Sequence, residues 1–129
     1  MSVKYSLNDE QLEKLIYAVD NDAQAAETAI SNYLATDGQR LIKSSIVNLI
    51  PVSNRQKKHA KNSNPLQHNS YNMSVVIYPK KQFYYLYYVD QGLGTSTGRQ
   101  PAEFMERGLE QAIEPLFNDM LQTFNEVFN

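Results

Sequence analysis

The residues that could do chemistry in this chain are few, and they lie far apart. His59 and His68 are the only histidines, cysteine is absent, and no Asp or Glu lies between Asp37 and Asp90. A zinc site needs three or four closely placed ligands, and a catalytic nucleophile needs a base with an orienting partner. We therefore expect both histidines to be solvated loop residues, and we predict no catalytic residue, no metal site and no cofactor.

Two further patterns resemble sites but have simpler explanations. Four glutamates recur at spacings of three and four residues near the C-terminus: Glu103, Glu106, Glu110 and Glu114. This spacing is typical of the solvated face of a helix. Gly92 and Gly94 are not followed by the Gly-Lys-Ser/Thr of a phosphate-binding loop, and the dinucleotide-binding spacing is also absent. We interpret these glycines as turn residues.

The charges of the chain are strongly segregated, although the net charge is only −2. Residues 1–37 hold seven acids and two bases, residues 38–89 hold eight bases and no acid, and residues 90–129 hold seven acids and two bases. The densest basic run contains Arg55, Lys57, Lys58 and Lys61. Such a run is either a solvated loop or a docking loop for something anionic, which would be nucleic acid or an acidic surface such as that of a neighbouring subunit.

An aromatic stretch runs from Phe83 to Val89 and contains four tyrosines: Tyr84, Tyr85, Tyr87 and Tyr88. Aromatic side chains pack well across the pleated surface of a sheet, so we predict a strand with rings on both faces. A small domain rarely covers both faces of such a strand, which favours contact with a partner. Stacking on nucleic-acid bases is the alternative, but the tyrosines alternate with apolar residues rather than with Lys or Arg.

The elements that must position these residues follow from periodicity and caps. Asn8, with Gln11 three residues later, predicts the start of a helix that ends at residues 20–22. A second apolar stripe predicts one long helix over about residues 23–50, with Gly38 on the stripe as a kink or a close helix crossing and Pro51 at its end. Residues 52–71 have no period and are interpreted as a mobile basic loop.

The C-terminal half predicts a hairpin followed by a helix. Residues 73–78 and 82–89 are the two expected strands, joined at Pro79. Pro101 suits the first turn of the last helix, which we expect to continue in phase through Pro115. The predicted fold class is α+β: a single domain over residues 1–129, with two long helices and one shorter helix packed on a small antiparallel sheet built around a β-hairpin.

Targeting signals do not stand out in the sequence. There is no apolar run behind a basic N-terminus, and no stretch approaches the roughly 18–20 apolar residues that span a bilayer. We therefore expect no membrane partner and a soluble intracellular product.

The order of these elements, together with one motif, resembles the small neck proteins of long-tailed phages, the minor capsid, head–tail joining or tail-completion proteins. The likeness rests on a long helix that ends at Pro51, a polar loop, a hairpin, and an aromatic-aromatic-Val-acid-x-Gly return strand before Pro-x-x-Phe. The matching residues are Tyr87, Tyr88, Val89, Asp90, Gly92, Thr95, Pro101, Phe104 and Met105. The chain departs from the family pattern in lacking a Thr/Ser-Gly after Pro51 and in the additional Gln91.

The resemblance implies a non-enzymatic virion protein of a tailed phage or prophage, made in the cytoplasm of the bacterial host. Such proteins assemble as oligomeric rings at the head–tail junction, with other neck, connector or tail proteins, around the channel through which DNA passes. The four tyrosines would then form an assembly interface with Asp90, Gly92 and Phe104. The alternative function is a small nucleic-acid-binding protein that uses the basic loop and the tyrosines.

Overall fold

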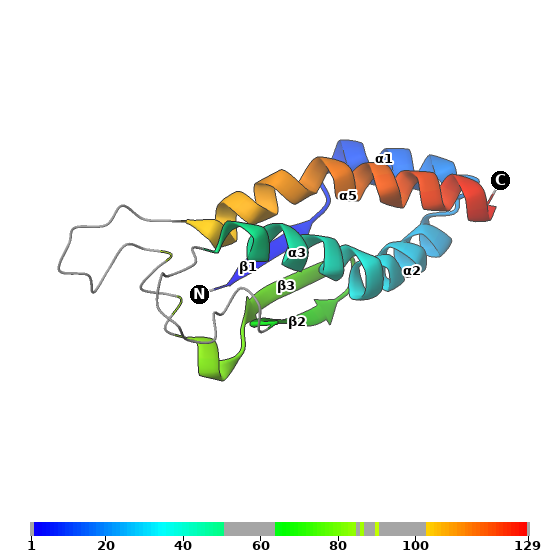
Figure 1. Cartoon of the computed structure of the whole chain (residues 1–129). Helices are drawn as coiled ribbons and strands as arrows, with labels where there is room; N and C mark the ends of the chain where they lie inside the picture. The colour runs from blue at the N-terminus through cyan, green and yellow to red at the C-terminus, as the bar shows by residue number, and fades with distance from the viewer. Residues whose placement is uncertain (1, 51–63, 85, 87–89, 91–102, 129) are drawn as a thin grey trace.

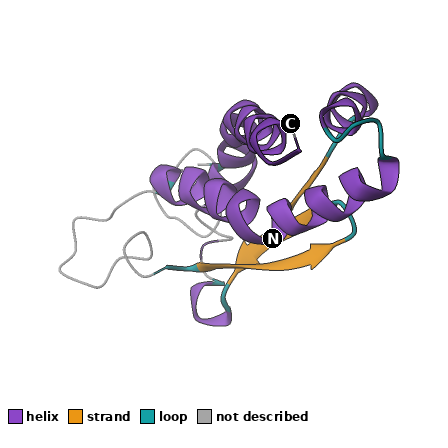
Figure 2. Ribbon diagram, turned by 90° about the vertical axis from the view of Figure 1, so that its right-hand side faces the viewer, coloured by secondary structure: helices purple, strands orange, loops and turns teal. Residues whose placement is uncertain are grey.

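The computed structural model describes residues 2–50, 64–84, 86, 90 and 103–128. Its architecture is α+β, as predicted, with a helical layer on one side of a three-stranded antiparallel sheet (Figures 1 and 2). The described elements are β1 (Val3–Ser6), α1 (Asp9–Ala18), α2 (Ala23–Tyr33), α3 (Gln39–Leu49), β2 (Leu66–Tyr71), β3 (Ser74–Pro79) and α5 (Phe104–Phe128). Helices α3 and α5 pack closely against each other, and α1 lies alongside α5 (Figure 1).

The predicted starts of the first two helices are confirmed by their side-chain caps. Asn8 Oδ1 accepts a hydrogen bond from the backbone N–H of Gln11 at 2.8 Å, and Gln11 Oε1 accepts one from the backbone N–H of Asn8 at 3.3 Å. Asp22 Oδ1 accepts from the N–H of Ala25 at 3.1 Å. Each cap satisfies a backbone donor that has no partner inside the helix. The two helices are therefore separated where the sequence predicts.

The long helix predicted over residues 23–50 is present as three consecutive segments. Helix α2 passes into a five-residue π-helical segment, Leu34–Gly38, which passes into α3. Gly38 thus lies in a widened turn of the helix, where a Cβ atom would come within 3.0 Å of Leu34 Cδ2 and 3.3 Å of a Tyr33 ring carbon. The expected irregularity at Gly38 takes the form of this π segment.

The sheet has the strand order β1-β3-β2, with β3 in the centre. Strands β2 and β3 form a hairpin in which Tyr71 pairs with Ser74, and the turn between them has a positive φ of 52° at Met73. Strand β1 pairs with the other edge of β3, with Tyr5 opposite Val75. The predicted β3 is therefore confirmed, but its hairpin partner precedes it in the chain.

Two of our predictions around this hairpin are wrong. Leu66–Tyr71 is an edge strand and not part of a loop that runs to residue 71. The expected return strand is not formed by its described residues, because Lys81–Phe83 is a 3-10 helix, Tyr84 follows in a turn, and Leu86 and Asp90 are helical. An edge strand tolerates polar residues because one edge of its backbone faces away from the sheet. The sequence of β2, which is rich in Gln, His, Asn and Ser, therefore concealed it.

Helix α5 supplies one wall of the core and continues through Pro115 as predicted. Its buried residues are Phe104, Met105, Gly108, Ala112, Leu116, Met120 and Phe124. Helix α3 crosses α5 closely at Gly108, where the Ser45 hydroxyl donates to the Gly108 carbonyl at 2.6 Å. A second link joins α2 to α5, because the Tyr33 hydroxyl donates to Asp119 Oδ2 at 2.6 Å. Burial and this hydrogen bond raise the pKa of Tyr33.

Candidate functional site

Asp90 and Phe104, both expected at an assembly interface, lie in the interior of the chain. Asp90 is only 4% exposed, its Oδ1 accepts from the backbone N–H of Met105 at 3.1 Å, and its backbone carbonyl accepts from the N–H of Glu103 at 2.9 Å. The Asp90 carboxylate thus satisfies a free donor in the first turn of α5. Phe104 is 0% exposed. The structure corrects our expectation for both residues: they organise the start of α5.

Of the remaining predicted assembly and docking residues, the structure describes only Tyr84. Tyr84 is 55% exposed, which is compatible with contact to a partner, and that contact stays a prediction. The other predicted interface residues, Tyr85, Tyr87, Tyr88 and Gly92, lie outside the described residues. The same holds for His59 and for the docking-loop residues Arg55, Lys57, Lys58 and Lys61.

His68 is not a loop residue, because it lies in strand β2 and contacts helix α3. Its Nδ1 is 2.8 Å from Lys43 Nζ, so the Lys43 ammonium donates to the neutral imidazole. Partial burial and the nearby Lys43 charge lower the pKa of His68. The pKa of Lys43 is also lowered, by burial and by the charge of Lys80. A polar contact between α3 and the edge of the sheet therefore depends on an uncharged histidine.

This contact predicts a pH dependence of folding stability. The unfolded chain takes up a proton at His68 near the ordinary pKa of about 6.5, whereas the folded chain does so only at lower pH. Protonation of His68 therefore favours the unfolded state. The contribution of this contact to the free energy of unfolding should be fully present above a pH of about 6.5 and should be lost as the pH falls below it. Urea unfolding measured between about pH 7 and 5.5 should show a smaller loss for His68→Gln than for the unaltered chain. His59→Gln is the matched control, and a slope that disappears in that variant instead would contradict the assignment.

The row of C-terminal glutamates behaves as predicted. Glu103, Glu106, Glu110 and Glu114 are all exposed on α5 or at its start. Within the described part of the chain, no three His, Cys, Asp or Glu side chains gather in a group that could hold a metal ion. These four glutamates therefore provide surface charge.

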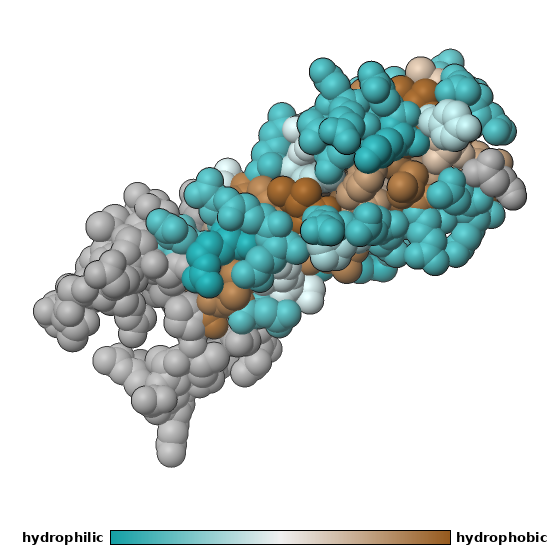
Figure 3. Space-filling model, turned by 90° about the horizontal axis from the view of Figure 1, so that it is seen from above, coloured by the Kyte–Doolittle hydropathy of each residue, from teal (hydrophilic) through white to brown (hydrophobic). Residues whose placement is uncertain are grey.

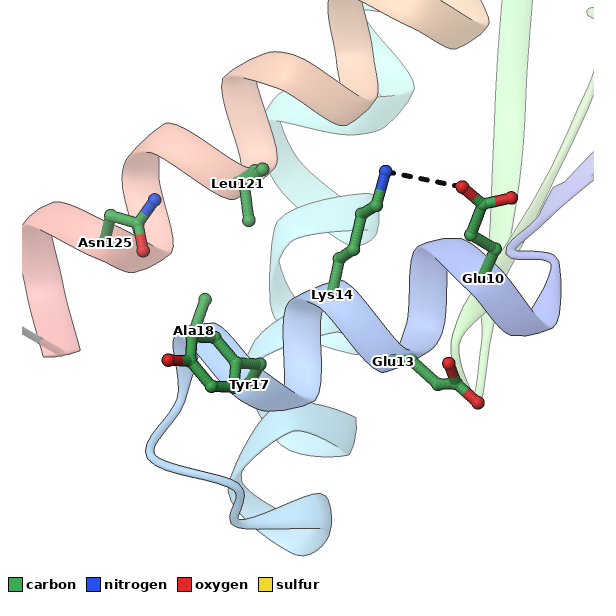
Figure 4. A pocket seen from close by; sticks show the side chains of 7 residues that line it. All are labelled: Glu10, Glu13, Lys14, Tyr17, Ala18, Leu121 and Asn125. Atoms are coloured by element: carbon green, nitrogen blue, oxygen red, sulfur yellow. Dashed lines mark ion pairs between the residues drawn. The ribbon is translucent and has the colours of Figure 1, made fainter.

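A groove lies between α1 and the C-terminal half of α5 (Figure 4). It has a volume of about 470 Å³ and is lined by Glu10, Glu13, Lys14, Tyr17, Ala18, Leu121 and Asn125. Figure 4 shows Leu121 pointing from α5 toward α1, while Lys14 turns to Glu10, with which it forms a 3.4 Å ion pair. Glu13 points away from that pair (Figure 4). The groove thus has an apolar floor and an acidic rim.

Large apolar side chains are unusually exposed around this groove. Tyr17, which lines the groove, is 75% exposed, and beyond the groove Val127 and Phe128 at the end of α5 are 69% and 36% exposed. Viewed from above, the helical layer shows a band of apolar surface between polar flanks (Figure 3). Contiguous exposed apolar surface marks contact with another molecule more often than isolated apolar residues do. We name the residues that line the groove the α1–α5 surface.

Sequence reasoning missed the α1–α5 surface, although a signal was present. The apolar stripe of α1 is Leu12, Leu15, Ile16 and Val19. Tyr17 lies off that stripe, among polar neighbours, and an aromatic residue there has no place in the core of the chain. Aromatic residues on an otherwise polar helix face are enriched in protein interfaces.

The charge segregation of the sequence is also a segregation on the folded surface. The acids of α1, the following turn and α2 are Asp9, Glu10, Glu13, Asp20, Asp22 and Glu27, of which Glu10 and Glu13 line the α1–α5 surface. The described residues 39–50 and 64–84, in α3 and the β2–β3 region, include Arg40, Lys43, Lys80 and Lys81 and no acid. One chain therefore presents an acidic helical surface and a basic surface on different elements.

Comparison of the chain with protein-family models, with curated proteins and with solved structures gives no match. Among the helices that the structure describes, none has the length and apolar character required to cross a membrane.

Proposed function

We propose that this chain is a structural virion protein of a tailed phage or prophage, which assembles at the head–tail junction as part of an oligomeric ring. Its partners would be further copies of itself and other neck, connector or tail proteins. The observation that carries the proposal is the α1–α5 surface, with Tyr17 75% exposed beside an apolar groove. A side chain of this kind is typical of the anchor residues of protein interfaces.

Charge complementarity supports a second copy of the chain as the occupant of this surface. The rim of the α1–α5 surface is acidic, whereas the described residues of α3 and the β2–β3 region provide cations only. Different surfaces of identical chains would then meet head to tail, and such contacts generate a closed ring when the rotation between subunits closes. The sequence resemblance supports the neck as the place of this ring.

Immunolabelling of purified virions tests the location directly. An antibody against this chain should label the head–tail junction, and virions labelled only on the head surface, only along the tail, or not at all would overturn the proposal. A monomeric state of the isolated protein would leave the location untouched, because ring assembly can require the partner that precedes it.

The contribution of Tyr17 gives a sharper prediction. Because the side chain is largely exposed, Tyr17→Ser should leave the free energy of unfolding within about 0.5 kcal/mol of its original value. Truncation of an aromatic anchor typically costs about 2 kcal/mol of binding, so self-association should weaken roughly 30-fold. Analytical ultracentrifugation would measure the assembly of the isolated protein, and counting tailless heads in infected-cell lysates would measure it in the virion pathway.

Tyr71→Ser provides the matched control, because Tyr71 is 55% exposed on the hairpin and does not line the α1–α5 surface. It should assemble like the unaltered chain. Equal effects of the two substitutions would show that exposed tyrosines matter in general, and would remove the case for the α1–α5 surface.

A further inference from the structure

We propose that the groove between α3 and the residues preceding β2 is a binding site for a phosphate group of a nucleic-acid backbone, with Lys43 and Lys80 as its cations. This α3 groove has a volume of about 390 Å³ and is lined by Gln39, Arg40, Lys43, Ser44, Val47 and Asn64. It is separate from the α1–α5 surface, and it does not depend on the proposed function.

The lining of the α3 groove consists mainly of hydrogen-bond donors. Lys43 contributes an ammonium, Arg40 a guanidinium, Ser44 a hydroxyl and Asn64 a carboxamide. Arg40 Nη1 is held 3.2 Å from Asp37 Oδ1, and Lys43 uses one N–H to bind His68 Nδ1 at 2.8 Å. Since an ammonium has three N–H groups, Lys43 retains donors for a ligand. The combination of the Lys43 ammonium with neutral donors in a small concavity suits an oxyanion, and Lys80, outside the lining itself, supplies a second cation near Lys43.

The charge around Lys43 lacks an internal counterpart. Lys80 is near enough for its charge to lower the pKa of Lys43, and Lys80 is itself anchored by a 2.7 Å hydrogen bond from its backbone N–H to the Pro65 carbonyl. Within the described ranges, neither lysine forms an ion pair with a carboxylate. Two like charges held together in this way repel each other, and an anion between them would relieve that repulsion.

Gln39 provides an independent observation. The residue is only 7% exposed, it lines the α3 groove, and its Oε1 is buried with no hydrogen-bond partner in the described part of the chain. Buried polar atoms normally have partners, so an unpartnered one in the lining of a groove calls for an explanation, such as a water, an ion or a ligand group. A half-turn of the Gln39 carboxamide exchanges its oxygen and nitrogen, so that it presents N–H groups at the same place.

The extent of the positive charge favours a polyanion over a single carboxylate. Arg40 is paired with Asp37, but Lys43, Lys80 and Lys81 have no acid among the described residues of 39–50 and 64–84. A positive region of this kind attracts a chain of phosphates along its length. An acidic protein surface instead presents separate carboxylates with other kinds of residue between them. We therefore assign the site to nucleic acid.

Fluorescence anisotropy with a short labelled DNA duplex of mixed sequence tests this assignment over a series of KCl concentrations. The unaltered chain should bind with an affinity that falls steeply with salt. Lys43→Gln/Lys80→Gln should bind at least about tenfold more weakly at low salt, and the slope of log K against log[salt] should become shallower by about 2, because each phosphate contact contributes about 0.9. Lys4→Gln, which is exposed on β1 and lines neither the α3 groove nor the α1–α5 surface, is the matched control and should bind as the unaltered chain does.

Three results would overturn the proposal: no binding by the unaltered chain, binding that is insensitive to salt, or equal binding by the double variant. Poly-glutamate is the competitor that separates the two classes of partner. If it displaces the duplex as well as unlabelled DNA does at equal charge, the α3 groove is a docking site for acidic protein. Unchanged thermal unfolding of the double variant would show that any loss is local, and failure here leaves the head–tail location and the α1–α5 surface untouched.

Discussion

Gly108→Ala is expected to destabilise the protein by about 3 kcal/mol, although alanine ordinarily stabilises a helix interior by about 1 kcal/mol relative to glycine. A Cβ atom at residue 108 would lie 2.6 Å from both Ile46 Cα and Ile46 Cγ1, and 2.9 Å from the Ile46 backbone nitrogen. Backbone atoms cannot move away from an added methyl group as the end of a flexible side chain can. Helices α3 and α5 would have to separate, and the hydrogen bond from Ser45 to the Gly108 carbonyl would be lost.

Urea unfolding followed by circular dichroism measures this effect, and Gly38→Ala is the matched control. Both glycines lie within helical segments, but the nearest atom to a Cβ at residue 38 is the flexible Leu34 Cδ2, at 3.0 Å. We expect a change of at most about 1 kcal/mol for the control, since the gain in helix propensity offsets the crowding. A Gly108→Ala protein as stable as the unaltered chain would mean that α3 and α5 do not cross at this distance.

Phe104→Ala is the second large effect, with an expected loss of about 3–5 kcal/mol in the free energy of unfolding. The ring is 0% exposed and lies at the start of α5. Phe104 stands between Glu103 and Met105, whose backbone N–H groups both donate to Asp90. Its removal deletes buried apolar surface and leaves a cavity that the surrounding helix and sheet can fill only in part. The loss should appear as a lower urea midpoint with an unchanged slope.

Phe128→Ala removes the same ring from the other end of α5 and serves as the control. Phe128 is 36% exposed and makes an edge-on contact with Phe124 at 6.0 Å between ring centres. We expect a cost of about 1 kcal/mol, which reflects that aromatic contact. If the two substitutions cost the same, Phe104 is not a core residue, and its assignment to an assembly interface would be open again.

The helices could be predicted well because their signals are local. The Asn8 and Asp22 caps act on backbone N–H groups three residues away, and an apolar stripe is read from a single segment. The range of the second helix was predicted from its apolar stripe and from Pro51, although the structure divides it into α2, a π segment and α3 in place of the expected kink or close crossing at Gly38. Nothing beyond a window of a few residues was needed for these predictions.

The sheet could be predicted only in part, because strand pairing is not local. The apolar sequence of β3 marked the central strand, but the polar sequence of β2 gave no alternating pattern. Phe83 and Tyr84 have high strand propensity, yet they follow Pro79 in a 3-10 helix and a turn. Tertiary context overrode propensity at these residues, as is common for β-formers.

The contacts that define the candidate sites also could not be predicted from the sequence. Lys43 and His68 are 25 residues apart in the chain, and Ser45 and Gly108 are 63 apart. Gly108 was one glycine among several, and only the crossing of α3 and α5 shows why it has no side chain. The sequence marked Asp90 as the acid of the aromatic motif. Only the hydrogen bond from the backbone N–H of Met105 shows that Asp90 acts at the start of α5.

The π segment has a consequence for the phase of the long helix. Buried residues recur along it at every fourth position: Ala26, Ile30, Leu34, Gly38, Ile42, Ile46 and Ile50. A regular α-helix has 3.6 residues per turn, so a step of four residues rotates each successive side chain by about 40° beyond a full turn. The widened turn at Leu34–Gly38 winds the chain less per residue and takes up part of this drift.

Both halves of the helix can therefore bury the same side of the chain over their combined length. If the same residues were instead wound as an ordinary α-helix throughout, every residue of α3 would be rotated by about 100° relative to α2. Ile46 would leave Gly108, and Lys43 would leave His68. The widened turn thus sets the orientation of α3 toward both α5 and the sheet.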